Sequence, residues 1–292
     1  MQKDFRIKKI LIPYDFSETA DLSLEHAVFM AKLLKAEITL LHIVETLTFT
    51  SAISHALSGF EKKVETASNE KLRELADRLH QENGVVAHVL TDVGKIYKRI
   101  VHNAKQTHSD LIIMGTHGSS GGSSVVGSNT AKVVMESNIP VISVQSHSKK
   151  IGFTRIVLPI DDSPESRQKV NFAMEIATVY NAHVFVVGIM QSKNEDYQRK
   201  FRIKVEQVVE FLSTHNIVCE STLVVGDDLA KLTLATATQL DADLVIIMTE
   251  QEPSITGLLL GTYATKVVNQ SKIPIMTVRP AEIDPDRITV SF

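Results

Sequence analysis

A glycine-rich stretch between a short apolar run and a polar helix start is the part of this sequence best suited to chemistry. The four residues 111–114, Leu-Ile-Ile-Met, are typical of a strand buried on both faces. Glycines follow at 115, 118, 121, 122 and 127, and residues 128–135 predict a helix with a polar start. A strand, a glycine loop and a helix N-terminus together can cradle phosphate, because glycine lets the backbone approach the anion and the helix end supplies unpaired N–H groups. A flexible Gly/Ser connection is an equally open interpretation of the loop alone.

The elements that must position this loop alternate along the first half of the chain. We expect strands at residues 9–14, 37–44, 85–90, 110–114 and 140–145, with helices at 17–35, 52–83, 94–106 and 128–137. Ser17 is the expected N-cap of the first helix. Alternation of strands and helices predicts a parallel sheet with helices on both faces.

The second half of the chain repeats the first. Residues 155–163, Arg-Ile-Val-Leu-Pro-Ile-Asp-Asp-Ser, match residues 9–17, Lys-Ile-Leu-Ile-Pro-Tyr-Asp-Phe-Ser, at an offset of 146. Later matches, such as 243–248 with 110–114, have an offset of about 134. A repeat of this length indicates a duplicated domain, because solenoid units run about 20–50 residues. We expect domains at residues 1–148 and 152–281 and a C-terminal tail at 282–292.

These motifs resemble those of the universal stress protein family. The nucleotide loop of that family has Gly, two residues, Gly, nine residues, and then Gly-Ser or Gly-Thr. Gly115, Gly118 and Gly127-Ser128 fit this pattern, whereas the spacer 119–126 has eight residues, one fewer. The resemblance covers both halves. It implies an α/β fold of two tandem doubly wound domains, each a five-stranded parallel sheet flanked by helices, of the Rossmann-like, adenine nucleotide alpha-hydrolase-like type.

The resemblance also implies an adenine-nucleotide site for ATP or AMP in the first half, where Mg²⁺ can accompany ATP. Doubly wound sheets bind ligands beyond the carboxyl ends of their strands, where the strand order reverses. The residues expected near the base and ribose are Pro13, Tyr14, Asp15, Ile43, Met114 and Gly115, and those expected near the phosphates are His117, Gly118, Gly127, Ser128 and Asn129. Two alternatives stay open, since Asp15 could instead cap the first helix and Ile43 could simply belong to the core.

The second half departs from the nucleotide-loop pattern. Met248-Thr-Glu-Gln-Glu252 stands where the first half has Met114-Gly-Thr-His-Gly118, so both glycines are lost. Glu250 and Glu252 bring negative charge toward the expected place of the phosphates, and like charges repel. Gly261-Thr262 survives at the start of the following helix. We therefore expect one nucleotide per chain, bound in the first half.

The composition limits the classes of function. The net charge is −3, from 31 basic and 34 acidic residues, which argues against a general nucleic-acid surface. No apolar run reaches the roughly 18 residues that span a bilayer, so no membrane partner is expected. The N-terminus has no signal-peptide pattern, and the single cysteine, Cys219, excludes an intramolecular disulfide. We expect a cytoplasmic location.

No catalytic or metal-binding residue can be named from the sequence, because no carboxylate pair, ligand cluster or activated nucleophile is recognisable. The leading hypothesis is a stress-response protein that binds an adenine nucleotide and acts through its conformation or its partners. A slow ATP hydrolase that uses Mg²⁺ and His117 is one alternative. A nucleotide-independent small-ligand or protein-interaction module is the other.

The resemblance also implies an assembly. In this family the last strands of two subunits commonly pair across a two-fold axis. Residues 140–145 and 274–279 are the corresponding strands here, and they could pair within one chain as an intrachain pseudo-dimer. Such pairing would cover two sheet edges that otherwise invite aggregation. A homodimer of the whole chain is also compatible with the sequence.

Overall fold

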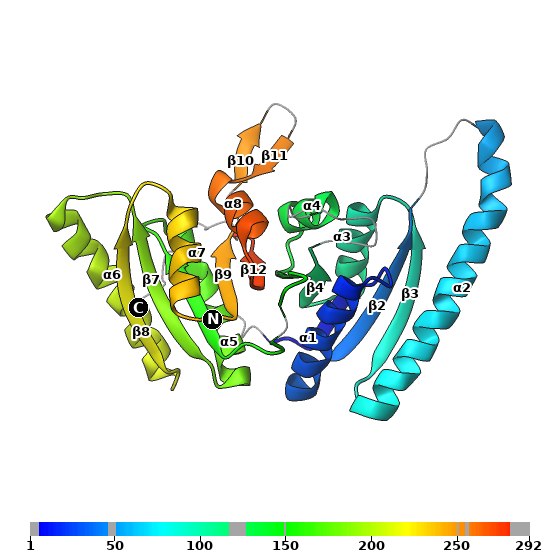
Figure 1. The fold of residues 1–292 in the computed structure, drawn as a ribbon, viewed down its shortest axis with the longest axis horizontal. Coiled ribbons are helices and arrows are strands. Elements are labelled where there is room, and N and C mark those ends of the chain that lie inside the picture. Colours follow the sequence, from blue (N-terminus) through cyan, green and yellow to red (C-terminus); the bar gives the residue numbers. More distant parts are fainter. Residues whose placement is uncertain are drawn as a thin grey trace, which may run out of the picture. The chain divides into compact units, whose positions relative to one another are not determined.

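Two compact units make up the chain, Ile7–Ile151 and the residues from Gly152 onward. The computed structural model describes residues 6–45, 51–116, 127–148, 150–249, 251–254 and 257–280. Each unit is a parallel sheet flanked by helices, as Figure 1 shows. The predicted fold class, two tandem doubly wound α/β domains, is confirmed.

The first unit alternates strands and helices as predicted. Its strands are β1 (Lys9–Pro13), β2 (Glu37–Val44), β3 (Ala87–Val93), β4 (Leu111–Gly115) and β5 (Val141–Val144), and its helices are α1 (Glu18–Leu34), α2 (Ser51–Asn83), α3 (Ile96–Gln106) and α4 (Ser128–Glu136). The strand order is β3-β2-β1-β4-β5, and the neighbouring strands are parallel. Helices α1 and α2 contact each other on one face of the sheet, and α3 and α4 contact each other on the opposite face.

The core of the first unit lies in its central strands. Ile10, Leu11 and Ile12 of β1 and Ile112 and Ile113 of β4 have 0% exposed surface. Helices cover both faces of these strands, which explains why their sequences are continuous apolar runs and not alternating ones. Burial of such side chains contributes about 1.5–3 kcal/mol each before conformational entropy is subtracted.

Helix α1 begins as the sequence predicts. Ser17 is its N-cap, and the Ser17 hydroxyl accepts a hydrogen bond of 3.2 Å from the N–H of Ala20. The helix ends where Lys35 adopts a left-handed conformation with φ of 55°, and the Lys35 N–H donates to the carbonyl of Ala31. These two caps fix the helix directly after the end of β1.

Strands β1 and β4 separate before they reach their carboxyl ends. Their paired residues are Ile10 with Leu111 and Leu11 with Ile112, whereas the pairing of β1 with β2 continues to Pro13 and Leu41. The strand order reverses between β1 and β4, and a doubly wound sheet binds its ligand at that point. The residues that follow β1 and β4 are therefore the candidates for a ligand site.

Strand β3 differs from its predicted range of 85–90. It runs from Ala87 to Val93 and pairs with β2 along its whole length. Helix α2 ends at Asn83, and Gly84 follows with φ of 67°, so the chain enters the sheet later than expected. The polar end of the strand, including Thr91 and Asp92, is tolerated because β3 lies at the edge of the sheet.

The second unit repeats this architecture. Its elements are β6 (Arg155–Ile160), the 3₁₀ helix η1 (Glu165–Lys169), α5 (Val170–Tyr180), β7 (His183–Met190), α6 (Glu195–Thr214), β8 (Cys219–Val225), α7 (Leu229–Gln239), β9 (Leu244–Met248), β10 (Gln251–Ser254), β11 (Gly257–Leu260), α8 (Thr262–Gln270) and β12 (Ile275–Val278). The order β12-β9-β6-β7-β8 matches that of the first sheet. The antiparallel hairpin of β10 and β11 was not predicted, and it takes the place of the glycine loop.

Candidate functional site

The residues that follow β1 are tied to the adjacent strand and to α1. The N–H of Tyr14 donates to the carbonyl of Leu41 at 2.8 Å, which extends the ladder beyond Pro13. The buried Tyr14 hydroxyl donates to the Asp21 carboxylate of α1. Burial, together with this bond, raises the pKa of the Tyr14 phenol. Tyr14 therefore stays protonated at neutral pH and acts as a donor within the protein.

Asp15 supports the cap of α1. Its carboxylate accepts hydrogen bonds from the Ser17 N–H at 3.2 Å and from the Ser17 hydroxyl at 2.6 Å. Asp161 makes the same two bonds with Ser163 in the second unit. Because the same hydrogen bonds between aspartate and serine occur in both units, the aspartate alone does not mark a nucleotide site. Asp15 is half-buried.

Ile43 lies near the carboxyl end of β2 and is half-buried. The preceding residue, His42, has Nδ1 2.8 Å from the carbonyl oxygen of Tyr14, so the ends of β1 and β2 are joined by a side chain. Phe16 packs against the His42 ring, with 5.1 Å between centroids. The expected base end of the site is thus a connected patch that carries apolar surface.

Gly115 permits close packing of α1 on β4. A Cβ atom at this position would lie 2.8 Å from Cγ2 of Thr19 and 3.1 Å from the Thr19 carbonyl oxygen. The space that the missing side chain leaves is therefore taken by α1. The carbonyl of Gly115 accepts a 3.0 Å hydrogen bond from the Thr130 hydroxyl of α4, while Met114 is buried within the strand.

The N-terminus of α4 lies beside the end of β4. Gly127 is its N-cap, and the Gly127 N–H donates to the carbonyl of Thr116 at 2.7 Å. Ser128 is exposed and Asn129 is half-buried. The N–H groups of Ser128, Asn129 and Thr130 donate no hydrogen bond within the part of the chain that the structure describes. A helix end of this kind attracts anions through its free N–H groups and its dipole.

The structure gathers most of the predicted site residues at one edge of the first sheet. Pro13, Tyr14, Asp15 and Ile43 lie at the ends of β1 and β2, and Met114, Gly115, Gly127, Ser128 and Asn129 lie at the end of β4 and the start of α4. His117 and Gly118 lie outside the described residues. The arrangement offers apolar and carboxylate contacts at one end and backbone donors at the other.

A charged cluster next to this edge was missed by sequence reasoning. Asp92, at the end of β3, accepts hydrogen bonds from Arg99 Nε at 2.6 Å and from the Asn103 amide at 2.5 Å. Partial burial opposes ionisation, but the bonds from Asn103, Arg99 and the Val93 N–H outweigh it and hold the pKa of Asp92 below its ordinary value. The spacing of Arg99 and Asn103 by four residues on one helix was the available signal.

The register of the second sheet corrects the sequence alignment of the two loops. Gly115 pairs with Val144, and Met248 pairs with Val278. The next residue, Thr116 or Thr249, donates to the same partner carbonyl in each unit, both at 2.9 Å. Met248 therefore occupies the position of Gly115, and not that of Met114 as the sequence comparison assumed. Apolar strands of similar composition hide such a one-residue shift.

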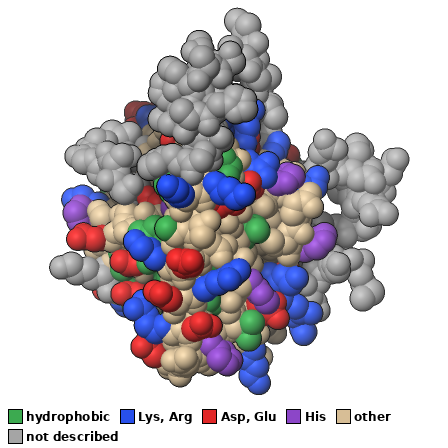
Figure 2. Space-filling model, turned by 90° about the vertical axis from the view of Figure 1, so that its right-hand side faces the viewer, with side chains coloured by type: hydrophobic (Ala, Val, Ile, Leu, Met, Phe, Trp, Pro, Cys, Tyr) green, Lys and Arg blue, Asp and Glu red, His purple; other side chains and the backbone are tan. Residues whose placement is uncertain are grey.

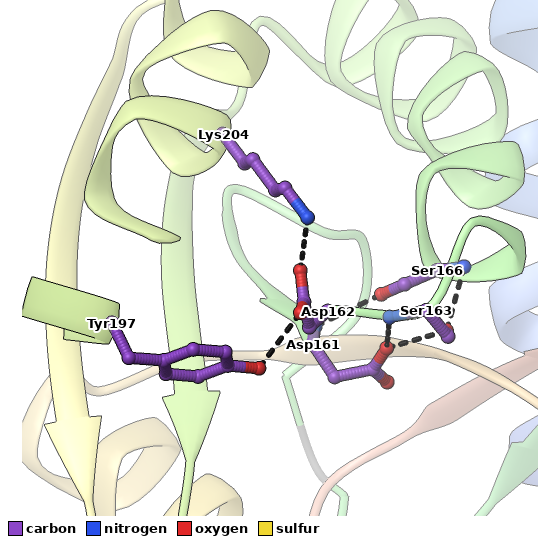
Figure 3. A network of polar contacts seen from close by, with 6 residues as sticks. All are labelled: Asp161, Asp162, Ser163, Ser166, Tyr197 and Lys204. Atoms are coloured by element: carbon purple, nitrogen blue, oxygen red, sulfur yellow. Dashed lines mark hydrogen bonds and ion pairs between the residues drawn. The ribbon is translucent and has the colours of Figure 1, made fainter. Parts of the chain in front are cut away.

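The loop after β6 is fixed to α6 by a network that Figure 3 shows. Asp162 accepts a hydrogen bond from the Tyr197 hydroxyl at 2.7 Å and pairs with Lys204. The bonds from Lys204 and Tyr197 hold the pKa of Asp162 below its ordinary value. These side chains are well exposed, so the ion pair itself contributes at most about 1 kcal/mol.

The first unit holds the equivalent loop in a different way. Phe16 occupies the position of Asp162, and Lys71 of α2 lies with Nζ 5.8 Å from the Phe16 ring centroid. Lys71 and Lys204 are equivalent because each precedes three buried residues at the same spacing, Leu72, Leu75 and Leu79 in α2 and Val205, Val208 and Leu212 in α6. A cation–π contact thus replaces an ion pair and a tyrosine bond, so the loop beside Asp15 is held by fewer polar contacts.

Among the described residues, no group of three His, Cys, Asp or Glu side chains could hold a metal ion. No helix in the described ranges is long and apolar enough to cross a bilayer. Acidic and basic side chains are interspersed on the face in Figure 2, so that face has no single-sign field for nucleic acid.

Comparison with known proteins settles the family. The model of the universal stress protein family matches the chain twice, over residues 6–145 and 152–279. The chain belongs to the universal stress protein family. Its two matches make it a tandem member, in agreement with the repeated fold.

Individual relatives support the same assignment. A universal stress protein of Methanocaldococcus jannaschii is 32% identical over 153 residues, which cover 47% of this chain and 94% of the relative. A universal stress protein of Mycolicibacterium smegmatis is 23% identical and covers 93% of this chain and 97% of its own length. The crystal structure of one from Archaeoglobus fulgidus is 20% identical, with a TM-score of 0.72, and covers 96% of this chain and 100% of that chain. This last likeness shows the shared fold.

Proposed function

We propose that this universal stress protein binds an adenine nucleotide, ATP or AMP, in its first domain, residues 1–148. The observation that carries the proposal is the free N-terminus of α4, from Gly127 to Thr130, next to the strand end at Thr116. A phosphate at this place would receive backbone hydrogen bonds and the favourable end of a helix dipole. The base would then lie toward Asp15 and Ile43, where the sheet offers a carboxylate and apolar surface.

The backbone N–H donors at the start of α4 fit a phosphate, and the described residues provide no separate set of ligands for Mg²⁺. No cluster of three acidic or histidine ligands exists among the described residues. A magnesium ion with ATP would therefore be held mainly by the phosphate oxygens and water, as is common for this ion. The protein would act in the stress response of the cytoplasm through the conformation that the nucleotide stabilises or through a partner protein.

The proposal places one nucleotide on each chain. In the second domain, residues 152–281, Met248 stands at the position of Gly115, and η1 with Glu165 replaces the turn that contains Thr19. The loop after β6 is also bound to α6 through Asp162. The fixed loop and the loss of the loop glycines therefore make a nucleotide less favourable at this edge than in the first domain.

The assembly that we propose is an intrachain pseudo-dimer through β5 and β12. Each strand is the last of the order within its own five-stranded sheet. An uncovered edge is prone to pairing with another chain, and mutual pairing of the two strands would remove both edges. A homodimer of the whole chain is compatible with this arrangement.

Equilibrium dialysis of the full chain against ATP, ADP and AMP tests nucleotide binding. Saturable binding at micromolar to roughly millimolar concentration is expected, since backbone donors supply modest affinity without a charged side chain. Absence of binding of all three nucleotides up to about 5 mM would contradict the proposal, because such affinity is below that of ordinary ligand sites.

A further inference from the structure

A pocket of about 350 Å³ lies at the opposite end of the first sheet, where the strands begin. Its walls come from the first residues of β1 and β2, from β3, and from the C-terminal end of α3. The candidate nucleotide residues lie at the carboxyl ends of the same strands. The pocket is therefore a separate site, and nothing in the proposed nucleotide function uses it.

The floor of the pocket carries an unpaired hydroxyl. Thr39 of β2 is 9% exposed and lines the pocket, between the fully buried residues Ile38 and Leu40. The Thr39 hydroxyl forms no hydrogen bond with any other residue that the structure describes. The hydroxyl is not sealed from solvent, so water can serve as its partner when the pocket is empty. A molecule in the pocket would replace that water as the partner.

The second unit shows what fills the equivalent place. Val157 pairs with Phe185 as Leu11 pairs with Thr39, so Phe185 occupies the position of Thr39. The Phe185 ring is 3% exposed and stacks on the His183 ring at 4.2 Å between centroids. In the repeated fold this position is thus occupied by an aromatic ring.

A cation also contacts that ring. The guanidinium carbon of Arg155 lies 4.7 Å from the Phe185 ring centroid, and Arg155 Nε donates to the carbonyl of Leu240 at 2.7 Å. In the first unit Lys9 holds the same place, and its Nζ lies 3.5 Å from the carbonyl oxygen of Thr107. Both units therefore have a cationic side chain at this position, whereas only the second unit has an aromatic ring next to it.

We propose that the first domain uses this pocket to bind a small one-ring aromatic molecule that carries a hydroxyl or carboxylate substituent. The ring would take the place that Phe185 fills in the second domain, beneath the Lys9 ammonium, which attracts an aromatic face. The substituent would exchange a hydrogen bond with Thr39. His88 and Glu37, whose Nε2 and carboxylate oxygen lie 3.2 Å apart, also line the pocket. The volume is at the lower end of the range of small-molecule sites, which suits one ring.

The test measures the binding of phenol and benzoate by saturation-transfer NMR, with cyclohexanol and cyclohexanecarboxylate as non-aromatic controls of equal size. Phenol or benzoate should bind at roughly millimolar concentration, as befits a ligand of so few atoms, and the saturated controls should bind about tenfold more weakly. Failure of both aromatic probes to bind at about 20 mM would overturn the proposal, as would equal binding of the saturated controls.

Two variants separate the pocket from adventitious binding. Thr39→Phe copies the second domain and should fold normally while abolishing binding of the aromatic probes, because its own ring fills the space. Thr39→Val keeps the shape but removes the hydroxyl, and it should weaken binding by about three- to tenfold, the value of one hydrogen bond. Unchanged binding by Thr39→Phe, with a native circular dichroism spectrum, would place the probe elsewhere and refute the assignment. Nucleotide affinity should be the same in both variants, so this result is independent of the nucleotide proposal.

Discussion

Single side chains at the edges of the first sheet have roles that residue type alone does not reveal. Asp15 was expected to contact a ligand or cap a helix, and the structure shows it supporting Ser17, the cap itself. Asp161 does the same in the second domain, so this aspartate belongs to the fold in both units. The proposed nucleotide site therefore rests on the backbone donors at the start of α4 and not on this aspartate.

Asp92 should make stability depend on pH in a known direction. Its folded-state pKa is lowered, so its contribution is present at pH values above the ordinary carboxyl pKa of about 3.9 and is lost as the pH falls through the lower folded value. Asp92→Asn should cost about 1–3 kcal/mol at pH 7, because it removes charged hydrogen bonds with Arg99. Urea unfolding at pH 7 and pH 3 checks this.

The control for Asp92 is an exposed charge pair. Lys204→Met breaks the pair with Asp162, in which both side chains are more than a third exposed, and should cost at most about 1 kcal/mol. A difference between Asp92→Asn and the wild type that stayed the same at pH 3 as at pH 7 would show that the effect is not electrostatic.

At the scale of elements, much of the fold follows from the sequence. The apolar runs of β1 and β4, the cap at Ser17 and the repeat itself predicted the strands, the first helix and the duplication. Besides the hairpin of β10 and β11, two features were missed, and both have a physical reason. The polar end of β3 does not resemble a strand because edge strands need less apolar surface. The one-residue shift between β4 and β9 was invisible because both strands are uniformly apolar and their register is set by pairing.

The site was less predictable than the fold. The helix start at Gly127 was predicted from the Gly-Ser motif and lies beside β4 as expected. The reason for Gly115 was not foreseen, because the contact with Thr19 depends on how closely α1 approaches β4. The pocket under Lys9 was not foreseen either, since it appears only when Thr39 is compared with Phe185 through the strand register.

The packing of α1 on β4 should be sensitive to a single methyl group. Gly115→Ala would bring its Cβ within 2.8 Å of Thr19 Cγ2, so it should destabilise the first domain by about 1–3 kcal/mol through overpacking. Thr19→Ser removes the nearest methyl group and should restore part of that loss in the double variant. Thermal unfolding of the wild type, the two single variants and the double variant gives the coupling free energy between the two positions. Strict additivity of the two changes would contradict the contact.

At the scale of the whole molecule, the proposed pairing of β5 with β12 predicts which amides exchange slowly with solvent. The carbonyls of Pro140 and Val144 accept bonds from β4, so the alternate residues Val141 and Ser143 turn toward the other edge of β5. Their N–H groups should be protected in hydrogen-exchange NMR of the full chain. Exchange within seconds at neutral pH, with β4 amides protected, would show that this edge is not paired.

The two domains differ at both the carboxyl and the amino edges of their sheets. The first keeps a free helix terminus at one edge and an open pocket at the other. In the second domain, Met248 stands in place of Gly115 at the carboxyl edge, and Phe185 stands in place of Thr39 at the amino edge. We propose from this asymmetry that ligands bind to the first domain, whereas the second domain keeps the fold without binding them.

Titration calorimetry of the full chain with ATP and with AMP, using two matched variants, tests whether nucleotides bind only to the first domain. Ser128 and Thr262 are both exposed and both follow a glycine N-cap of nearly equal φ, −57° and −55°. A glutamate at either place favours the helix dipole, so both variants should fold, but near a phosphate it repels. We predict one nucleotide per chain, affinity reduced about tenfold or more in Ser128→Glu, and unchanged affinity in Thr262→Glu. Two equivalent sites per chain, or loss of binding with Thr262→Glu alone, would contradict the account.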